Sequence, residues 1–318
     1  MLPYFLLIFG FILLAKGADF FIDGASEIAQ YFHVSPLFIG LTLAAFGTSA
    51  PEAAVSIKAT LSGVNGIALG NVIGSNIANI CLAIGIAALI KPLFFENTTS
   101  KKELPFLVLS TFIIFLFCLD FTNSHSATSM ISRTEGIILL VLMVVFLFYL
   151  SRMAKNDRKQ TDRNILHPKI SLPKNILLTV VGGVAIIIGG NITVSNATLI
   201  AKIWGVSDKV IGISIVAFGT SVPEIVTAIV AIKKNQISIA VGNIVGSNLF
   251  NILFVLGIAS TIKNISLSSD VIFDAGVCLF ITILFFLFSK IHKKIGKLQG
   301  LILIVFYIGY MFSLFIIK

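Results

Sequence analysis

Two glutamates stand in stretches of sequence that otherwise carry no charge. Glu52 ends the segment GLTLAAFGTSAPE, which begins at Gly40, and Glu224 ends the segment GISIVAFGTSVPE, which begins 172 residues later at Gly212. A carboxylate inside an apolar membrane helix costs about 2.5–3.5 kcal/mol on insertion scales. Its presence at matching positions of two segments therefore indicates cation binding. The alternative is a protonated or hydrogen-bonded glutamate with a structural role only.

A second repeated block follows each glutamate and supplies further oxygen atoms. It reads GNVIGSNIAN from Gly70 to Asn79 and GNIVGSNLFN up to Asn251. The hydroxyl and amide side chains of the two kinds of block are Thr48, Ser49, Ser75, Asn79, Thr220, Ser221, Ser247 and Asn251. Neither block repeats a His or a Cys, so the donor set favours Na+, Ca2+, Mg2+ or Mn2+ over zinc and copper. Two carboxylates balance one divalent or two monovalent cations, which predicts competition between the two.

A proline precedes each glutamate and should interrupt its helix. Pro51 and Pro223 have no N–H to donate to the carbonyls of Gly47 and Gly219. Irregular backbone is tolerated at membrane depth only where it is buried in protein or lines a cavity, and broken helices often hold coupling ions. No phosphate-binding Walker sequence is present, so the sequence favours coupling to an existing ion gradient.

The composition is that of a helical protein that crosses the membrane many times. Apolar residues make up 57% of the 318, charged residues make up 12%, and mean hydropathy is +1.04. At about 20 residues per crossing, the length accommodates about ten helices and leaves no room for a large soluble domain. The expected spans lie near residues 3–22, 35–58, 66–90, 104–121, 134–151, 175–200, 206–232, 236–261, 271–289 and 298–317.

The basic residues are best interpreted as determinants of topology. The net charge is +9, but no basic and aromatic patch accompanies it, so we expect no nucleic-acid partner. Lys and Arg are more frequent in the loops on the side of the segment from Arg152 to Lys174 than in the opposite loops. The positive-inside rule then places this segment in the cytoplasm and both termini outside it. Size and the lack of a regulatory domain favour the inner (plasma) membrane of a prokaryote.

The segment 152–174 is the only substantial linker, and it separates a repeat at 1–151 from a repeat at 175–318. Each repeat holds five predicted spans. Because five is odd, the second repeat must enter the membrane from the opposite face, which predicts the inverted-repeat architecture of many secondary transporters. The predicted fold is thus an all-α polytopic membrane protein with ten transmembrane helices in two inverted five-helix repeats.

Two smaller groups of residues have simpler interpretations. Lys16 and Asp19 are spaced i, i+3 and are expected to neutralise each other near the membrane surface. Cys81, Cys118 and Cys278 all fall in apolar spans, so we expect buried thiols and no disulfide framework.

In these motifs the chain resembles the calcium/cation antiporter superfamily, and within it the prokaryotic sodium/calcium exchangers. The GTSxPE and GSNxxN blocks, each present twice, match the alpha-repeats of that superfamily. The resemblance implies that spans two, three, seven and eight form the ion-binding core, over which spans one and six slide. It implies that Glu52 and Glu224 bind Ca2+ and that backbone carbonyls come from Ala45, Thr48, Ala217 and Thr220. It also implies Na+ contacts at Ser49, Ser75, Ser221 and Ser247.

One departure from the family pattern concerns the last residue of the second block. Sodium/calcium exchangers of this group often carry Asp there, whereas this chain has Asn251, which matches Asn79. The expected function is a secondary active antiporter that exports Ca2+ in exchange for Na+, and not an enzyme. The alternatives are an antiporter with another pairing (driven by H+, dependent on K+, or carrying Mg2+ or Mn2+), a cation channel, and a membrane scaffold. We expect no cofactor and no obligatory protein partner beyond the ions and the lipid bilayer.

Overall fold

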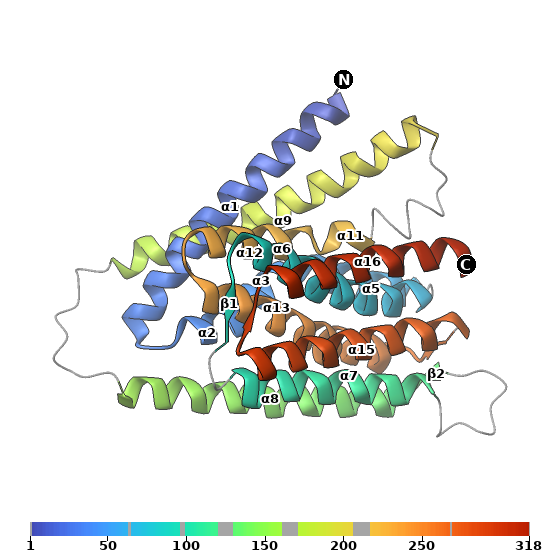
Figure 1. The fold of residues 1–318 in the computed structure, drawn as a ribbon. Coiled ribbons are helices and arrows are strands. Elements are labelled where there is room, and N and C mark those ends of the chain that lie inside the picture. The colour runs from blue at the N-terminus through green and yellow to red at the C-terminus, as the bar shows by residue number, and fades with distance from the viewer. Residues whose placement is uncertain are drawn as a thin grey trace. The chain divides into compact units, whose positions relative to one another are not determined.

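The computed structural model describes residues 2–62, 65–95, 99–119, 130–160, 171–205, 217–267 and 269–317, and most of them are helical (Figure 1). Within these ranges seven helices are long and apolar enough to cross a membrane, and a helix pair broken at Ser49 makes an eighth span if it is counted as one. The predicted span near 104–121 is the shorter helix α7 (Leu104–Cys118), and the predicted span near 206–232 lies partly outside the described residues. The many-span helical fold is confirmed, while the number of ten spans stays a prediction.

The described helices group into two compact units that do not follow the two halves of the chain. Unit 1 comprises Met1–Thr48 and Val145–Gly246, and unit 2 comprises Ser49–Val144 and Ser247–Lys318. Two of the boundaries between the units divide a repeated block: one falls after Thr48, in the first copy of the glutamate-bearing block, and the other falls after Gly246, in the second copy of the asparagine-rich block. The helix α8 (Arg133–Gln160) continues into the predicted linker at 152–174.

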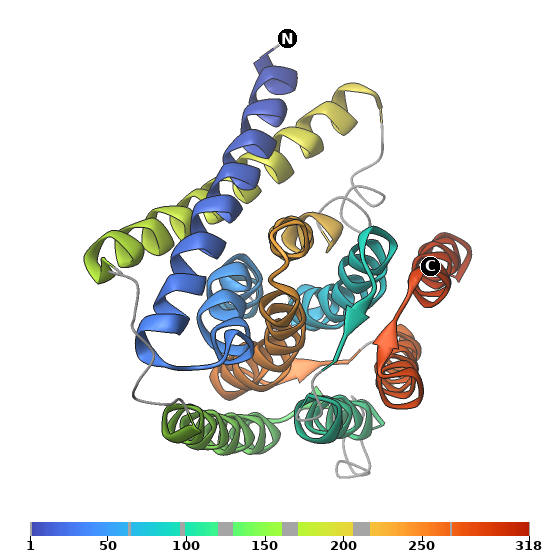
Figure 2. The same cartoon turned by 60° about the vertical axis from the view of Figure 1, so that its left-hand side comes forward.

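Unit 1 is built on two long helices, α1 (Leu2–Phe32) and α9 (Leu172–Ile203), which lie side by side in Figures 1 and 2. Their contact is made by small residues seven positions apart. A Cβ atom added to Gly17 would lie 2.9 Å from the carbonyl oxygen of Gly182, and one added to Gly189 would lie 2.9 Å from that of Gly10. The two backbones therefore touch directly, as in other membrane helix pairs whose seams consist of small residues.

Besides the end of α8, from Val145 on, the remaining elements of unit 1 are shorter helices that carry the repeated motifs. They are α2 (Pro36–Ile39), the π-helix η1 (Gly40–Ala44), α3 (Ala45–Thr48), α11 (Ala217–Thr220), α12 (Val222–Lys233) and the first part of α13 (Ile237–Phe250). Ser35 caps α2 by accepting a hydrogen bond from the N–H of Phe38, and Pro36 occupies its first turn.

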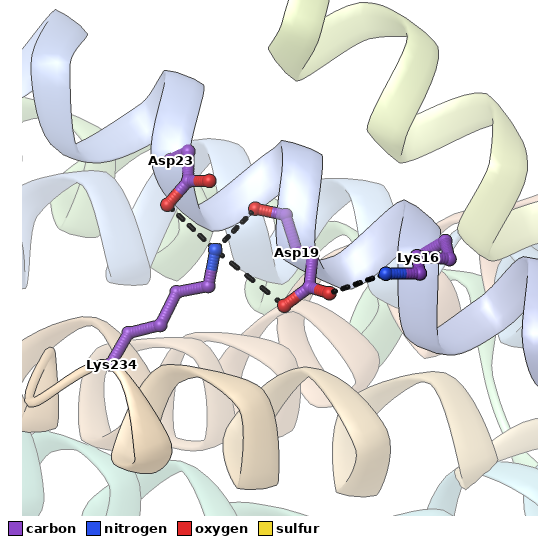
Figure 3. Close-up of polar contacts among 4 residues, drawn as sticks. All are labelled: Lys16, Asp19, Asp23 and Lys234. Carbon is purple, nitrogen blue, oxygen red and sulfur yellow. Dashed lines mark hydrogen bonds and ion pairs between the residues drawn. The ribbon is translucent and has the colours of Figure 1, made fainter.

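A cluster of charged residues ties α1 to the end of α12 (Figure 3). Lys16 and Asp19 form the predicted pair, with Nζ and Oδ2 3.9 Å apart. The sequence did not indicate the third partner. Nζ of Lys234 lies 2.6 Å from Oδ1 of Asp23 and 3.0 Å from the backbone oxygen of Asp19. These side chains are partly exposed, so solvent screens the ion pairs and each contributes little to stability.

Unit 2 contains the other halves of the motifs and the remaining spans. In chain order its elements are α4 (Ala50–Leu61), α5 (Asn65–Ala78), η2 (Asn79–Ile84), α6 (Gly85–Ile90), β1 (Leu93–Phe94), η3 (Thr99–Glu103), α7, β2 (Met130–Ile131), the start of α8, the end of α13, η5 (Asn251–Leu256), α14 (Gly257–Ile262), β3 (Ile265–Ser266), α15 (Ser269–His292), β4 (Lys294–Ile295) and α16 (Lys297–Ile317). The strands form two antiparallel pairs, β1 with β4 and β2 with β3.

The sequence repeat recurs in these elements at the same offset of 172 residues. Helices η2 and η5 correspond residue for residue, as do α6 and α14, and strands β1 and β3. Even the residues that end α6 and α14 agree, since Lys91 has φ −151° and ψ 137° and Lys263 has φ −150° and ψ 138°. Each strand that follows a repeated helix pairs with a strand from the other half of the chain, so the two repeats interlock within unit 2.

Candidate functional site

The helix that carries each glutamate is broken just before its proline, as the sequence predicts. α3 ends at Thr48, Ser49 adopts φ −84° and ψ 5°, and α4 begins at the next residue. In the second copy, α11 ends at Thr220 and Ser221 adopts φ −86° and ψ −2° before α12 begins. The prolines lie in the first turn of the new helices, where a missing N–H has no cost.

The break places both carboxylates in the first turn of a new helix. Glu52 in α4 and Glu224 in α12 each have 0% of their surface exposed. A helix N-terminus stabilises a negative charge by about 0.3–1 kcal/mol, and by up to about 2 kcal/mol when partly buried. Burying an ion costs several kcal/mol even after relaxation. The helix dipole thus offsets only part of that cost, and a bound cation would offset more of it.

In unit 1, the first motif packs against α13 through two glycines of the second block. A Cβ atom on Gly242 would lie 2.7 Å from the carbonyl oxygen of Leu37, and one on Gly246 would lie 2.7 Å from Cβ of Ala45. The hydroxyl of Thr48 lies 3.0 Å from Oδ1 of Asn243, to which it donates a hydrogen bond. Glycine is required because the backbone of the first motif occupies the space that a side chain would need.

The second motif of unit 1 packs against α9. A Cβ atom on Gly190 would lie 3.0 Å from Cγ of Pro223, one residue before Glu224. Ser221 is fully buried, and its Oγ has no hydrogen-bond partner among the described residues. Thr220 is buried as well, and Ala217 is the first residue of α11. The long helix α9 therefore lies directly against the segment that carries the second carboxylate.

In unit 2, an asparagine of the second block fastens the helix of Glu52. Nδ2 of Asn71 donates to the backbone oxygen of Glu52 at 3.2 Å and to Oγ of Ser56 at 2.9 Å. Ser56 in turn donates to the backbone oxygen of Ala68 at 3.4 Å. These contacts join α4 to α5, so the position of Glu52 is set by the block that follows it in sequence.

The two asparagines that end the second blocks, Asn79 and Asn251, lie in one cluster within unit 2. Asn79 donates from Nδ2 to Oδ1 of Asn248 at 3.0 Å, and Asn251 donates from Nδ2 to Oδ1 of Asn76 at 3.2 Å. The Oδ1 atoms of Asn79 and Asn251 are buried and have no hydrogen-bond partner among the described residues. These amide oxygens are neutral ligands of the type that hard cations bind.

Each of these two asparagines begins a π-helix, η2 at Asn79 and η5 at Asn251. A π-turn within an α-helix is frequently found at functional sites, because it locally changes the direction of side chains. Ser75 and Ser247 lie four residues earlier on the same helices and are fully buried. Hydroxyl, amide and carboxylate oxygens thus line the repeated helices of unit 2.

Of the predicted site residues, unit 1 contains Ala45, Thr48, Ala217, Thr220, Ser221 and Glu224, and unit 2 contains Ser49, Glu52, Ser75, Asn79, Ser247 and Asn251. Sequence reasoning missed the polar residues that hold them, namely Asn71, Asn76, Asn243 and Asn248. The signal was present, because all four are shared in register by the two repeated blocks. In the part of the chain that the structure describes, no three His, Cys, Asp or Glu side chains form a metal-binding group, and the three cysteines are buried free thiols.

Comparison with known proteins identifies the family. The chain matches the model of the sodium/calcium exchanger protein family over residues 2–152 and 174–316. It is 37% identical over 315 residues to a putative antiporter, CaxA, of Alkalimonas amylolytica, covering 96% of each chain. It is 32% identical over 345 residues to the sodium/calcium exchanger MaX1 of Methanosarcina acetivorans, covering 99% of each.

A solved structure of the sodium-calcium exchanger NCX_Mj, soaked with Na+ and Ca2+, superposes with a TM-score of 0.85 at 32% identity and covers 99% of each chain. The same elements that hold the buried glutamates and asparagines fall inside the matched residues. The chain belongs to the sodium/calcium exchanger family, whose members are membrane transporters and not enzymes.

Proposed function

We propose that this protein exports Ca2+ across the membrane in exchange for Na+, by alternating access of a site near the bilayer midplane. Glu52 and Glu224 bind the transported cations directly in this proposal. Their two negative charges balance one Ca2+ or two Na+, so the two ions compete for the same ligands. An inward Na+ gradient can then drive Ca2+ outward without ATP.

The observation that carries the proposal is the complete burial of both carboxylates in membrane helices. Removing a carboxylate from water costs several kcal/mol unless charge or hydrogen bonds compensate it. A transporter offsets this cost during each cycle by exchanging one cation load for another. A site that always holds one cation load or the other also explains why both copies of the motif carry a glutamate.

Neutral oxygens complete the proposed ligand set. The resemblance assigns backbone carbonyls of Ala45, Thr48, Ala217 and Thr220 to Ca2+, and the broken helices around Ser49 and Ser221 support this assignment. It assigns the hydroxyls of Ser49, Ser75, Ser221 and Ser247 to Na+. The open amide oxygens of Asn79 and Asn251 support their inclusion as neutral ligands. Ca2+ binds six to eight such oxygens in flexible geometry.

We also propose that α1 and α9 are the elements that move during transport. Their continuous contact through Gly10, Gly17, Gly182 and Gly189 supports motion as one rigid pair. The contact of Gly190 with Pro223 supports a mechanical link between that pair and the segment that precedes Glu224.

Calcium uptake into Na+-loaded proteoliposomes tests the proposal. We expect radioactive Ca2+ to enter only while an outward Na+ gradient is present, and Glu52→Gln and Glu224→Gln each to abolish uptake. Glutamine retains the shape of the side chain and removes its charge, so loss of uptake reports on the charge. Uptake at the wild-type rate in either variant would exclude that residue as a ligand.

A control on folding accompanies these variants. Both should elute as monodisperse proteins in detergent and should melt no lower than the wild-type protein without Ca2+. Removing a buried charge relieves its desolvation cost, so the ion-free variants are expected to be at least as stable as the wild type.

A second candidate is an antiporter of the same fold with another pairing, driven by H+, dependent on K+, or carrying Mg2+ or Mn2+. Asn251 favours it, because exchangers of the resembled group often carry a carboxylate at that position. The same proteoliposomes separate the two candidates. Uptake that ignores the Na+ gradient and follows an imposed pH gradient, or that requires K+, would support the second candidate.

The proposed location is the inner (plasma) membrane, with both termini outside the cytoplasm. Cysteines introduced one at a time at two exposed positions, Ser62→Cys and Ser171→Cys, test the orientation, because the three native cysteines are buried. A membrane-impermeant thiol reagent applied to intact cells should label the first and spare the second. The reverse labelling would contradict the proposed orientation.

A further inference from the structure

Four asparagines of the repeated blocks form a closed set of hydrogen bonds in unit 2. Asn76 donates from Nδ2 to the backbone oxygen of Asn248 at 3.2 Å, and Asn248 donates from Nδ2 to the backbone oxygen of Asn76 at 3.3 Å. Their side-chain oxygens accept from the other two members, Asn251 and Asn79 respectively. All four side chains are at most 1% exposed. The Nδ2 and Oδ1 atoms of Asn76 and Asn248 thus each have a hydrogen-bond partner within the cluster.

The cluster is reciprocal between the two repeats. Asn76 and Asn248 occupy equivalent positions, 172 residues apart, and each makes the same two side-chain contacts with the opposite repeat. Asn248 of the second repeat holds Asn79 of the first, and Asn76 of the first repeat holds Asn251 of the second. Each contact that the first repeat makes with the second is therefore matched by an equivalent contact that the second makes with the first, as at the interface of a two-fold symmetric dimer.

The orientation of an amide decides whether it can bind a cation. An asparagine side chain presents an oxygen acceptor on one side and an NH2 donor on the other. In Asn79 and Asn251 the nitrogen is engaged by the cluster, and the oxygen is the atom without a hydrogen-bond partner among the described residues. A rotation of the amide by half a turn would direct N–H groups at a cation in place of the oxygen. Both amides can serve as cation ligands only in the observed orientation.

We infer that Asn76 and Asn248 are positioning residues, which fix the amides of Asn251 and Asn79 so that their oxygens face the transported cation. This inference rests on the proposed function and adds two residues that do not themselves bind the ion. Their side-chain oxygens accept hydrogen bonds from Asn251 and Asn79, so the proposed role of Asn76 and Asn248 is to orient these two partners. The π-turns that start at Asn79 and Asn251 bring the two ligand side chains to the cluster.

Two pairs of variants test the inference by equilibrium binding of radioactive Ca2+ to the purified full-length protein. Asn248→Ala frees the amide of Asn79 to rotate. We expect the Ca2+ affinity of this variant to fall by about tenfold or more, because the buried amide nitrogen of Asn79 then lacks its acceptor while the oxygen faces the cation. Combination with Asn79→Asp supplies a carboxylate, which presents oxygen in either orientation. In that background the same Asn248→Ala change should alter Ca2+ affinity by no more than about twofold, the usual error of additivity.

The second pair of variants repeats the test on the other ligand, Asn251. It consists of the single variant Asn76→Ala and the double variant that combines Asn76→Ala with Asn251→Asp. It keeps the inference testable if one alanine variant fails to fold. Thr282→Val serves as the matched control, because it also removes a buried side-chain hydrogen bond in unit 2, from Oγ1 to the backbone oxygen of Cys278, at a distance of 2.7 Å. It should lower the melting temperature and leave Ca2+ affinity unchanged. Melting of the ion-free proteins is measured for every variant.

The possible outcomes distinguish failure of the proposed function from failure of the positioning role. Absence of saturable Ca2+ binding in the wild type contradicts the proposed function itself. If the wild type binds Ca2+ and the alanine substitution lowers affinity equally whether the ligand position carries Asn or Asp, the positioning role is overturned. The proposed function then stays intact. Unchanged affinity in both alanine variants, or failure of both to fold, also overturns the positioning role. A loss confined to the backgrounds with an asparagine ligand supports it.

Discussion

Replacing Gly246 by alanine should damage ion binding without changing any ligand. Gly246 lies on α13, and a Cβ atom there would come within 2.7 Å of Cβ of Ala45 and 2.8 Å of the carbonyl oxygen of Leu41. Neither neighbour can move out of the way by rotating a side chain, because one is a Cβ atom and the other belongs to the backbone. The whole segment from Leu41 to Ala45 must therefore be displaced.

The structure sets the size of that displacement. Carbon atoms in ordinary contact lie about 3.5–4.0 Å apart, so Ala45 must retreat by at least about 0.8 Å from the 2.7 Å position. Oxygen ligands of Ca2+ lie within a range of about 0.3 Å, from 2.3 to 2.6 Å. Because a misplacement of about 1 Å can cost about a hundredfold, we expect Gly246→Ala to weaken Ca2+ binding by about tenfold to a hundredfold. Overpacking should also cost about 1–3 kcal/mol of stability.

Gly183→Ala is the matched control for this substitution. Gly183 lies on α9 in the same unit, and a Cβ atom there would lie 3.7 Å and 3.8 Å from two ring atoms of Phe21, which is ordinary contact. Alanine at this position should be neutral or stabilising by about 0.5–1 kcal/mol, because it reduces backbone freedom in the unfolded chain.

The assay is Ca2+ binding to both purified variants, with Na+-driven uptake in proteoliposomes and thermal melting of the ion-free proteins. Wild-type affinity and wild-type melting in Gly246→Ala would contradict this prediction, because the added methyl group would then have been accommodated without moving Ala45. A lower melting temperature with wild-type affinity would show that the displaced segment contributes no ligand.

Three further predictions follow from single residues. Asn79 and Asn251 carry no titratable proton, so wild-type Ca2+ uptake should change little between pH 8 and pH 6.5, and a steep loss over that range would indicate proton coupling. Asn251→Asp adds a third carboxylate to the set, so Ca2+ should bind more tightly and uptake should become sensitive to acid, as a pH series on proteoliposomes would reveal. Lys234→Gln removes the contacts with Asp19 and Asp23; because these side chains are partly exposed, the free energy of unfolding should fall by no more than about 1 kcal/mol, measured by thermal melting.

Much of the candidate site could be predicted from the sequence because its determinants are local. A proline lacks an N–H wherever it stands, so the breaks before Pro51 and Pro223 follow from composition alone. A glutamate next to such a break necessarily falls in the first turn of a new helix. The repeat was visible because equivalent positions keep equivalent residue types, and the shared elements η2 and η5 recur at the predicted offset.

Contacts between distant segments could not be predicted in the same way. The sequence showed that Asn79 and Asn251 carry oxygens, but the direction of each amide depends on a partner about 170 residues away. Lys234 joins Asp19 and Asp23 only because α12 ends beside α1. The expected length of the first span was also too short, since α1 continues through these acids to Phe32.

The membrane class, the repeat, the broken helices and the type of ligand follow from the sequence alone, because hydrophobicity, proline geometry and donor chemistry are properties of single residues or short segments. The packed fold was needed to show which residues orient those ligands, and to show that the compact units take segments from both halves of the chain. The orientation of a side chain depends on the hydrogen bonds and the space that are available after the helices pack. Those partners come from segments that lie far apart in the sequence.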